Sequence, residues 1–357
     1  CRPTGAQPHS GFNQLALWAA APEWEGIRRV LIVVLGSIGR RHLRNLRALG
    51  QQDILLYRTH RATLPDEDLE GLPVFTDLAQ ALAEKPQGVI IASPTAAHLG
   101  TALPAARAGA NLLIEKPVSH TLEGLDELRE ALGLNHARAM VGFHFRYHPV
   151  LAEIRQILTE GSLGWTLSGR AHWGEYLPGW HPWEDYRASY AARMDLGGGV
   201  TNTLSHPFDY LRWMLGEVVY VSAVLGKLSD LELDVEDNTD ALLEFANGAR
   251  VSVHLDYYQQ PASHTLDLSC ERGRILWDNA DGSARVLPAD DLNSRQIIPP
   301  SGFERNEMFL AEMADFIRLC RGEHFEYCSL EDGIRVQQIV AAVRQSHAQD
   351  GQRVSLV

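Results

Sequence analysis

The sequence predicts an α/β protein of two domains: an N-terminal Rossmann domain on a parallel sheet, then an α+β domain on an open, mainly antiparallel sheet. Short β-branched runs alternate with helical segments up to about residue 147, which is typical of βαβ units. After that point, strand-like runs follow one another with short connections, as antiparallel strands do. The length of 357 residues also exceeds what one hydrophobic core usually spans.

The chain therefore divides into three parts. Residues 27–147 are predicted to form the first domain, and residues 148–357 the second. Residues 1–26 are expected to be an N-terminal extension, disordered or loosely docked. Their stretch LALWAAAP resembles the apolar core of a signal peptide, which is the alternative interpretation.

The first domain is built from apolar runs separated by helical patterns. The run RVLIVV is continuous and β-branched, which is typical of a strand buried on both faces. Strands are predicted at 29–34, 53–57, 88–92, 111–115 and 138–143. Helices are predicted at 38–49, 76–84, 95–109 and 121–132. Alternation of this kind predicts a parallel sheet.

The second domain begins with a predicted helix over 149–158 and ends with two helices, over 303–321 and 330–346. Ser329 and Asp332 are expected to form a capping box for the last of these. Strands are predicted at 165–175, 217–226, 240–246, 249–258, 264–270 and 274–278, with one helix at 200–215.

Composition excludes several classes of protein. The net charge of −13 argues against a nucleic-acid partner and against binding to an anionic membrane surface. No stretch approaches the roughly 20 apolar residues of a membrane-spanning helix. The four cysteines (Cys1, Cys270, Cys320 and Cys328) lack paired spacing, so we expect free thiols, a cytoplasmic protein and no metal site.

The turn after the first strand, VVLGSIGRRH, resembles a dinucleotide-binding fingerprint with its first glycine replaced by Val34. Gly36 stands where the backbone approaches a pyrophosphate, and Gly39 where helix and strand pack closely. Ser37 and Ile38 begin the helix whose amide groups would face the phosphates. A valine fits only a negative φ without strain, so we expect φ of Val34 to be negative.

The end of the second strand indicates the type of cofactor. An acidic residue there would bind the ribose 2′-hydroxyl of NAD. The sequence instead places Arg58 and Arg61 at this point, and arginine binds a 2′-phosphate through charge-assisted hydrogen bonds. We therefore favour NADP over NAD, the alternative being that both arginines only face solvent.

Two further motifs carry chemistry. The motif EKP places Glu115 and Lys116 at the carboxyl end of a strand, the edge that faces the ligand in such sheets. In the stretch GGGVTNTLSHPFDYLRWMLG, a single helix would carry Asn202, His206 and Asp209 on one stripe. An amide, an imidazole and a carboxylate would then face a common cleft.

Together these motifs resemble the Gfo/Idh/MocA oxidoreductase family, named for glucose–fructose oxidoreductase and inositol dehydrogenase. The resemblance spans residues 28–350 in roughly the family's order and spacing. It implies a dinucleotide-binding domain at 27–147 and a domain for substrate binding and oligomerisation at 148–357. It also implies NAD(P)-dependent hydride transfer at a secondary alcohol carbon of a sugar, sugar acid, polyol or nucleotide-sugar, in a homo-oligomer formed through the second sheet.

The resemblance also implies roles for single residues. Lys116 matches the EKP lysine of the family and His206 its catalytic histidine. Pro94, Thr95 and His98 match the loop along the cofactor, which Glu115 and Lys116 would also contact. Asn202 stands where inositol-dehydrogenase-like members have an aspartate, which puts a carboxylate-assisted proton relay in doubt, and Arg146 lies at the domain junction.

The stretch EYLPGWHPWEDYRASYAARMD, residues 175–195, is rich in aromatic, histidine and arginine side chains. Such a composition suits a carbohydrate pocket, with Tyr176, Trp180, His181 and Arg187 as candidates, although oligomer interfaces share it. Two other functions remain open. One is a glycosidase-like enzyme that keeps NAD bound, and the other is a non-catalytic cofactor-binding regulatory protein.

Overall fold

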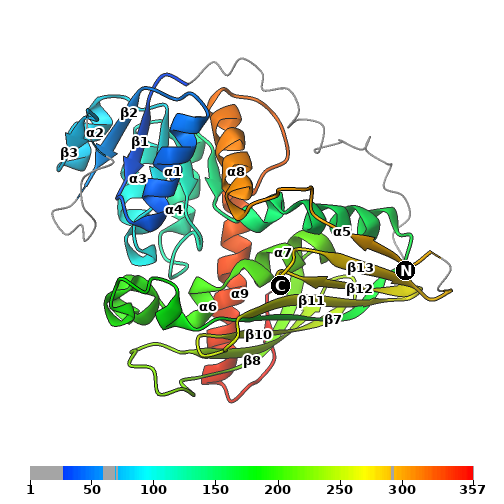
Figure 1. Ribbon diagram of the computed structural model, residues 1–357. Coiled ribbons are helices and arrows are strands. Elements are labelled where there is room, and N and C mark those ends of the chain that lie inside the picture. Colours follow the sequence, from blue (N-terminus) through cyan, green and yellow to red (C-terminus); the bar gives the residue numbers. More distant parts are fainter. Residues whose placement is uncertain (1–26, 59–68, 70, 291–292, 357) are drawn as a thin grey trace.

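The computed structural model describes residues 27–58, 69, 71–290 and 293–356 of the chain. Two β-sheets dominate it (Figure 1). The smaller sheet lies between two layers of helices, and the larger sheet has helices on one face only. No helix in the described ranges is long and apolar enough to cross a membrane.

The first sheet has the strand order β3-β2-β1-β4-β5-β6, and every pair in it is parallel. This is the order of doubly wound dinucleotide-binding folds, which confirms the Rossmann prediction. The strands are β1 (Val30–Val33), β2 (Ile54–Tyr57), β3 (Val74–Phe75), β4 (Gly88–Ile91), β5 (Asn111–Ile114) and β6 (Ala139–Val141). Among these strands only β3, which is two residues long, was not predicted from the sequence.

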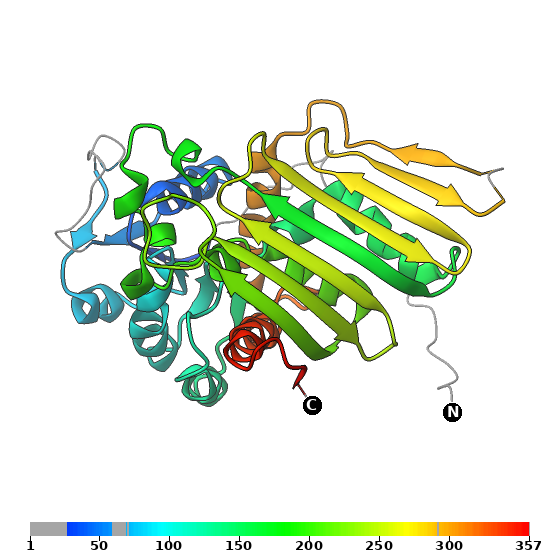
Figure 2. The ribbon, with the colours of Figure 1, turned by 90° about the horizontal axis from the view of Figure 1, so that it is seen from below.

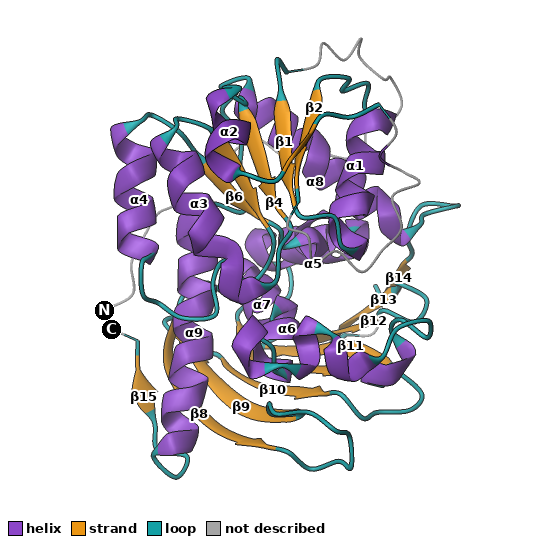
Figure 3. Ribbon diagram, turned by 90° about the vertical axis from the view of Figure 1, so that its left-hand side faces the viewer, coloured by secondary structure: helices purple, strands orange, loops and turns teal. Residues whose placement is uncertain are grey.

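Helices cover both faces of this sheet, as Figure 3 shows from the side. One face carries α2 (Leu78–Ala83), α3 (His98–Arg107) and α4 (Leu125–Leu134), and the other carries α1 (Ser37–Ala48) and α8 (Arg305–Cys320). Alternate strand residues serve the two cores: Leu31 packs toward the first group, and Ile32 packs with Phe316 of α8. A helix from the end of the chain thus completes the first domain.

The second sheet has the order β14-β13-β12-β11-β7-β10-β9-β8-β15. It is antiparallel except for the pair β7–β10, so the expectation of a mainly antiparallel sheet is confirmed. The strands are β7 (Thr166–Gly174), β8 (Val218–Gly226), β9 (Asn238–Phe245), β10 (Arg250–Asp256), β11 (Ser263–Cys270), β12 (Gly273–Asp278), β13 (Ala284–Pro288), β14 (Arg295–Ile297) and β15 (Val354–Ser355). Three of these strands, β13, β14 and β15, were not predicted from the sequence.

One face of the second sheet is packed and the other is open. Helices α5 (Pro149–Glu160), α7 (His206–Leu215) and α9 (Leu330–Ala348) lie on the packed side, and Figure 2 views the open side. Strand β10 shows the alternation: Val251, Val253 and Leu255 are buried, whereas Ser252 between them is exposed. The predicted capping box at Ser329 and Asp332 begins α9, with both of its reciprocal hydrogen bonds present.

The predicted single helix over 200–215 is wrong. The structure divides it into α6 (Val200–Thr203) and α7 (His206–Leu215), with Leu204 and Ser205 between them. Pro207 explains the break, because it lacks the N–H that a continuous helix would donate to the carbonyl of Thr203. Proline is tolerated in the first turn of a helix, and that is where α7 places it.

The expectation of a negative φ at Val34 is also wrong. Val34 has φ +67°, in the left-handed region that favours glycine. The turn after β1 therefore keeps the backbone of a glycine without having one. A left-handed conformation costs an L-residue about 1–2 kcal/mol.

Two variants at this position should separate strain from packing. Val34→Gly and Val34→Ala both remove the isopropyl group, but only glycine adopts φ +67° without strain. We expect Val34→Gly to be more stable than Val34→Ala by about 1 kcal/mol. Denaturant unfolding of the two variants measures the difference. Equal stabilities would mean that the turn relaxes to a negative φ once the valine is removed.

Candidate active site

Lys116 follows β5 at the carboxyl edge of the first sheet and meets the second domain there. Its Nζ donates a hydrogen bond to the carbonyl oxygen of Thr203 at 2.5 Å. This is the carbonyl that Pro207 leaves without its helical partner, so the break between α6 and α7 supplies the acceptor for the lysine. Burial lowers the pKa of Lys116 to about 8, and the charge of Arg305 lowers it while that of Glu115 raises it.

His206 is the first residue of α7, and its ring lies in an aromatic cage. Its neighbours are Phe143, His144, Phe145 and Trp173, with ring centroids at 5.4, 4.4, 4.9 and 5.7 Å. The side chain is buried, and neither ring nitrogen has a hydrogen-bond partner among the described residues. Burial lowers the pKa of His206 well below its usual value, and the nearby charges of His144 and Lys116 act in the same direction.

Buried polar atoms normally find a partner, so an imidazole with two unpartnered nitrogens indicates a ligand site. The structure therefore brings Lys116 and His206, two residues 90 positions apart, into one site at the domain junction. The lysine charge is close enough to affect the imidazole, which is the arrangement that the sequence resemblance implied.

Sequence reasoning missed three side chains of this site. His144 contacts His206 directly, Trp173 packs beside it, and Glu175 lies close enough to raise the pKa of Lys116. Glu175 is also held by the indole N–H of Trp173, which donates to its carboxylate at 2.7 Å. The only signal in the sequence was the aromatic and histidine content of FHFRYHP and of the end of the strand AHWGEY.

The glycine run before α6 explains how Asn202 is held. Gly197 and Gly199 have φ +79° and +98°, and a Cβ at Gly198 would collide with the carbonyl oxygen of Tyr190. The Asn202 amide donates to the carbonyl oxygens of Gly197 and Gly198 at 3.0 and 3.3 Å. Its own carbonyl oxygen is buried without a partner among the described residues, so it remains an available acceptor.

Arg146 and Asp209 are partners of each other. The guanidinium of Arg146 donates three hydrogen bonds of 2.6 to 3.2 Å to the Asp209 carboxylate, and both side chains are buried. The prediction that Asp209 shares one helical stripe with Asn202 and His206 and faces a common cleft is therefore wrong. Its carboxylate is occupied by Arg146. Burial raises the pKa of Asp209, against the lowering effect of Arg146.

The loop over 175–195 lies along the same junction, but its four predicted sugar-binding residues differ in how buried they are. Trp180 and His181 line a small depression with Leu177, and each has a buried ring nitrogen without a partner among the described residues. Tyr176 is 37% exposed. Arg187 is half-exposed and is held in ion pairs by Asp185 and Glu232, so it points to the surface.

The turn after β1 fits a dinucleotide. A Cβ at Gly36 would meet nothing within 4 Å, so the backbone is open where a pyrophosphate would approach, and Ser37 and Ile38 start α1 there. A Cβ at Gly39 would collide with the carbonyl oxygen of Val34. Gly36 therefore allows the pyrophosphate to approach the backbone, and Gly39 allows α1 to pack closely on β1, as the fingerprint requires.

The loops after β4 and β5 are tied together beside this turn. The His98 ring lies between two carbonyl oxygens, that of Ser93 at 2.9 Å and that of Pro117 at 3.0 Å. Pro94 and the buried Thr95 begin the short helical turn before His98. The ring of His98 thus holds the edge of the cofactor site through the backbone.

A buried polar cluster lies behind Lys116. His42 of α1 forms a hydrogen bond to the Glu115 carboxylate at 2.7 Å, and Glu312 of α8 completes a group whose ligand-type atoms lie within 4.8 Å of one another. Burial and the charge of Glu115 raise the pKa of Glu312 well above its usual value. Burial acts to raise the pKa of Glu115, but the hydrogen bond and charge of His42 lower it, so Glu115 rather than Glu312 is the carboxylate of this cluster that favours its charged form beside Lys116.

Two sets of predicted residues are only partly described. Arg58 directly follows β2, where its amide donates to the carbonyl of Phe75, but Arg61 lies outside the described residues. Cys270, Cys320 and Cys328 are buried free thiols, and Cys1 again lies outside the described part.

Comparison with known proteins gives several relatives. Levoglucosan dehydrogenase of Pseudarthrobacter phenanthrenivorans is 24% identical over an alignment of 307 positions, and the match covers 73% of this chain and 78% of that protein. Inositol 2-dehydrogenase of Corynebacterium glutamicum is 29% identical over an alignment of 238 positions, and the match covers 64% of this chain and 66% of that protein.

Solved structures share the fold. Levoglucosan dehydrogenase in complex with NADH and levoglucosan matches with a TM-score of 0.81 at 23% identity, over 92% of this chain and 99% of that one. The WlbA dehydrogenase from Bordetella pertussis, in complex with NADH and UDP-GlcNAcA, matches with a TM-score of 0.77 at 20% identity, over 92% and 98%.

Two family profiles match successive parts of the chain and together cover more than half of it. The profile of an oxidoreductase family with an NAD-binding Rossmann fold matches residues 28–143. The profile of the Gfo/Idh/MocA C-terminal domain matches residues 151–276. With both domains matched in order, the chain belongs to the Gfo/Idh/MocA family of oxidoreductases.

Proposed function

We propose that the protein is an NAD(P)-dependent dehydrogenase that transfers hydride to or from a secondary alcohol carbon of a sugar, sugar acid, polyol or nucleotide-sugar. The pairing of Lys116 with a buried His206 whose ring nitrogens have no described partner carries this proposal. Relatives named levoglucosan dehydrogenase and inositol 2-dehydrogenase support the substrate class.

The two side chains divide the handling of the hydroxyl proton. Lys116, with a pKa of about 8, is neutral often enough near pH 8 to accept the proton from the substrate hydroxyl. His206, the catalytic histidine that the family resemblance implies, has a different role. Burial holds the His206 ring neutral, so it binds and orients the same oxygen by a hydrogen bond.

The cofactor, when bound, accepts or supplies the hydride. The residues around the cofactor hold it in place. Gly36, Ser37 and Ile38 would contact its pyrophosphate, and the loops joined by His98 would lie along the remainder of the dinucleotide. The aromatic cage around His206 excludes water from the reacting carbon. Asn202, Trp180 and His181 offer unpartnered polar atoms for further sugar hydroxyls.

A turnover assay tests the proposal. The full chain is mixed with NAD⁺ or NADP⁺ and a panel of sugars, polyols and sugar acids that includes levoglucosan and myo-inositol. We expect absorbance of reduced nicotinamide in a one-to-one ratio with oxidised product for at least one compound. Cleavage of a glycoside without net reduction would instead establish the glycosidase-like function, and cofactor binding without any turnover would establish the regulatory one.

We further propose NADP as the preferred cofactor, with Arg58 at its 2′-phosphate. Arg58→Asp should lower the NADP-to-NAD ratio of kcat/KM by about tenfold or more, since it replaces a charge-assisted contact with repulsion. Arg29→Asp is the control, because Arg29 pairs with Asp53 and Glu84 at the opposite end of the strands. An unchanged ratio in Arg58→Asp would remove this residue from the cofactor site.

The homo-oligomer stays a proposal as well. The open face of the second sheet exposes apolar side chains such as Val224 and Leu242, which a second copy of the chain would cover.

A further inference from the structure

Glu175 directly follows β7, on the same face of the second sheet as Trp173, because side chains alternate along a strand. Gly174 between them faces the other way, where a Cβ would collide with Asp256 and Gln259. The indole N–H of Trp173 donates to Oε1 of Glu175 at 2.7 Å, and the backbone N–H of Glu175 donates to the carbonyl oxygen of Asp256 at 3.1 Å. Both the backbone and the carboxylate of Glu175 are therefore held in place.

The Glu175 carboxylate belongs to the same site as Lys116 and His206. Burial lowers the pKa of Lys116 to about 8, and the charge of Glu175 is one of the two that raise it, so the carboxylate lies within electrostatic reach of the amine. Trp173, which holds Glu175 through its N–H, also lies beside His206, with ring centroids 5.7 Å apart. One indole ring thus contacts both the carboxylate and the imidazole.

Glu175 also keeps an oxygen for a ligand. The Trp173 N–H engages Oε1, and within the described ranges no group donates a hydrogen bond to Oε2. Glu175 and Lys116 are half-buried, whereas His206 and Asn202 are buried. The exposed surface of the site therefore lies at the lysine and the carboxylate, where a molecule from solvent meets both.

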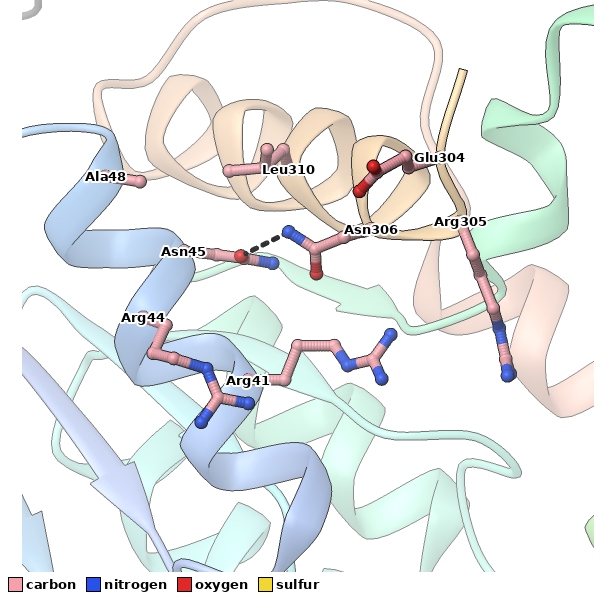
Figure 4. Close-up of a pocket in the computed structure, with 8 residues that line it drawn as sticks. All are labelled: Arg41, Arg44, Asn45, Ala48, Glu304, Arg305, Asn306 and Leu310. Atoms are coloured by element: carbon pink, nitrogen blue, oxygen red, sulfur yellow. Dashed lines mark hydrogen bonds between the residues drawn. The ribbon is translucent and has the colours of Figure 1, made fainter. Parts of the chain in front are cut away.

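A separate depression of about 490 Å³ lies between α1 and α8, and Figure 4 shows the residues that line it, among them Arg41. The guanidinium of Arg41 lies over the ring of Phe309 at 4.4 Å, and Phe309 stacks on His144 at 4.1 Å. These buried rings separate the depression from His206. The substrate is therefore expected on the side of Glu175.

We propose that Glu175 determines substrate specificity: its carboxylate accepts a hydrogen bond from a substrate group other than the reacting hydroxyl. This inference rests on the proposed dehydrogenase function. A carboxylate only accepts hydrogen bonds, so the substrate must carry a donor at that position, which a second hydroxyl or an amino group supplies. A carboxylate or phosphate at the same position is repelled. The Trp173 N–H fixes Oε1 and so directs Oε2 at this donor.

A comparison of variants and substrate analogues tests the inference. kcat/KM is measured for glucose, levoglucosan and myo-inositol, and for analogues in which single hydroxyls are replaced by hydrogen or by an amino group. In the wild type, one deoxy analogue should lose about tenfold or more against its parent, as expected for one hydrogen bond to a charged group. The amino analogue at that position should keep most of the activity of the parent.

Glu175→Ala should use that deoxy analogue and its parent equally well, because the acceptor is gone. Glu175→Gln keeps the size of the side chain and one acceptor oxygen, so it should retain part of the preference. Glu217→Ala is the matched control and should discriminate like the wild type. The Glu217 carboxylate is exposed and pairs with Arg212 beyond the end of α7.

Calorimetric titration of the NADH complex with the same compounds gives a readout that does not depend on turnover, and the dissociation constants should follow the same pattern. If Glu175→Ala discriminates between every parent and its deoxy analogues as the wild type does, the inference is wrong and the dehydrogenase stands. The expected binding pattern without turnover of any compound would do the reverse. Failure of all these compounds to bind would refute both.

Discussion

Lys116→Met is expected to lower kcat by about 10²-fold or more, because it removes the group that takes the hydroxyl proton. Lys116→Arg should lose as much activity, since a guanidinium keeps its charge and cannot accept a proton. The chain itself supports this distinction: of 32 basic residues only Lys85, Lys116 and Lys227 are lysines, and one of them stands where a lowered pKa is needed. Lys227→Met is the matched control and should be fully active.

His206→Ala should lower kcat by a similar factor. The double variant Lys116→Met with His206→Ala should lose far less activity than the product of the two single losses. Both residues act on one oxygen in one proton transfer, so their losses do not add as free energies. Cofactor affinity should change little in either variant, because the pyrophosphate is held by the turn at Gly36. Normal turnover by His206→Ala would make His206 a structural residue and refute this mechanism.

The pH dependence has a definite sign. The neutral amine of Lys116 accepts the proton, so kcat/KM for alcohol oxidation should rise with pH and level off above about 8. Carbonyl reduction needs the ammonium form and should fall over the same range. A pH profile without a titration near 8, in both directions, would show that another group carries the proton.

Much of the fold could be predicted because the buried strands are continuous apolar runs. The strands β3 and β15 escaped because two residues are too short for any periodicity to be read. Helix α8 was predicted as a helix, but no local pattern says that it covers the first sheet rather than the second. Its partners, such as Ile32, lie more than 250 residues earlier in the chain.

The site could be predicted only in part, for a similar reason. Lys116 and His206 were found from short motifs, which are local. The cage combines the adjacent residues Phe143 and His144 with Trp173 of β7, and it forms around His206 only when these distant segments meet. Pro207 was a visible signal for the helix break, and the consequence, a free carbonyl at Thr203 for the lysine, needed the structure.

Asp209→Ala is expected to lower the free energy of unfolding by about 3–5 kcal/mol. The substitution leaves the buried Arg146 without its main counter-charge, and the cost of an uncompensated buried charge exceeds the value of the pair itself. Asp332 lies 3.5 Å from the same guanidinium and balances only part of its charge. Denaturant unfolding measures the loss.

Two companion variants decide what Asp209 does. The double substitution Arg146→Met with Asp209→Leu removes both charges and should recover most of the stability, because no buried charge remains unpaired. The sequence placed Asp209 at the substrate, and that role makes a different prediction. A substrate contact would raise KM in Asp209→Asn while the free energy of unfolding stayed constant. The buried pair instead predicts a lower free energy of unfolding in Asp209→Asn, because a neutral amide cannot balance the charge of Arg146.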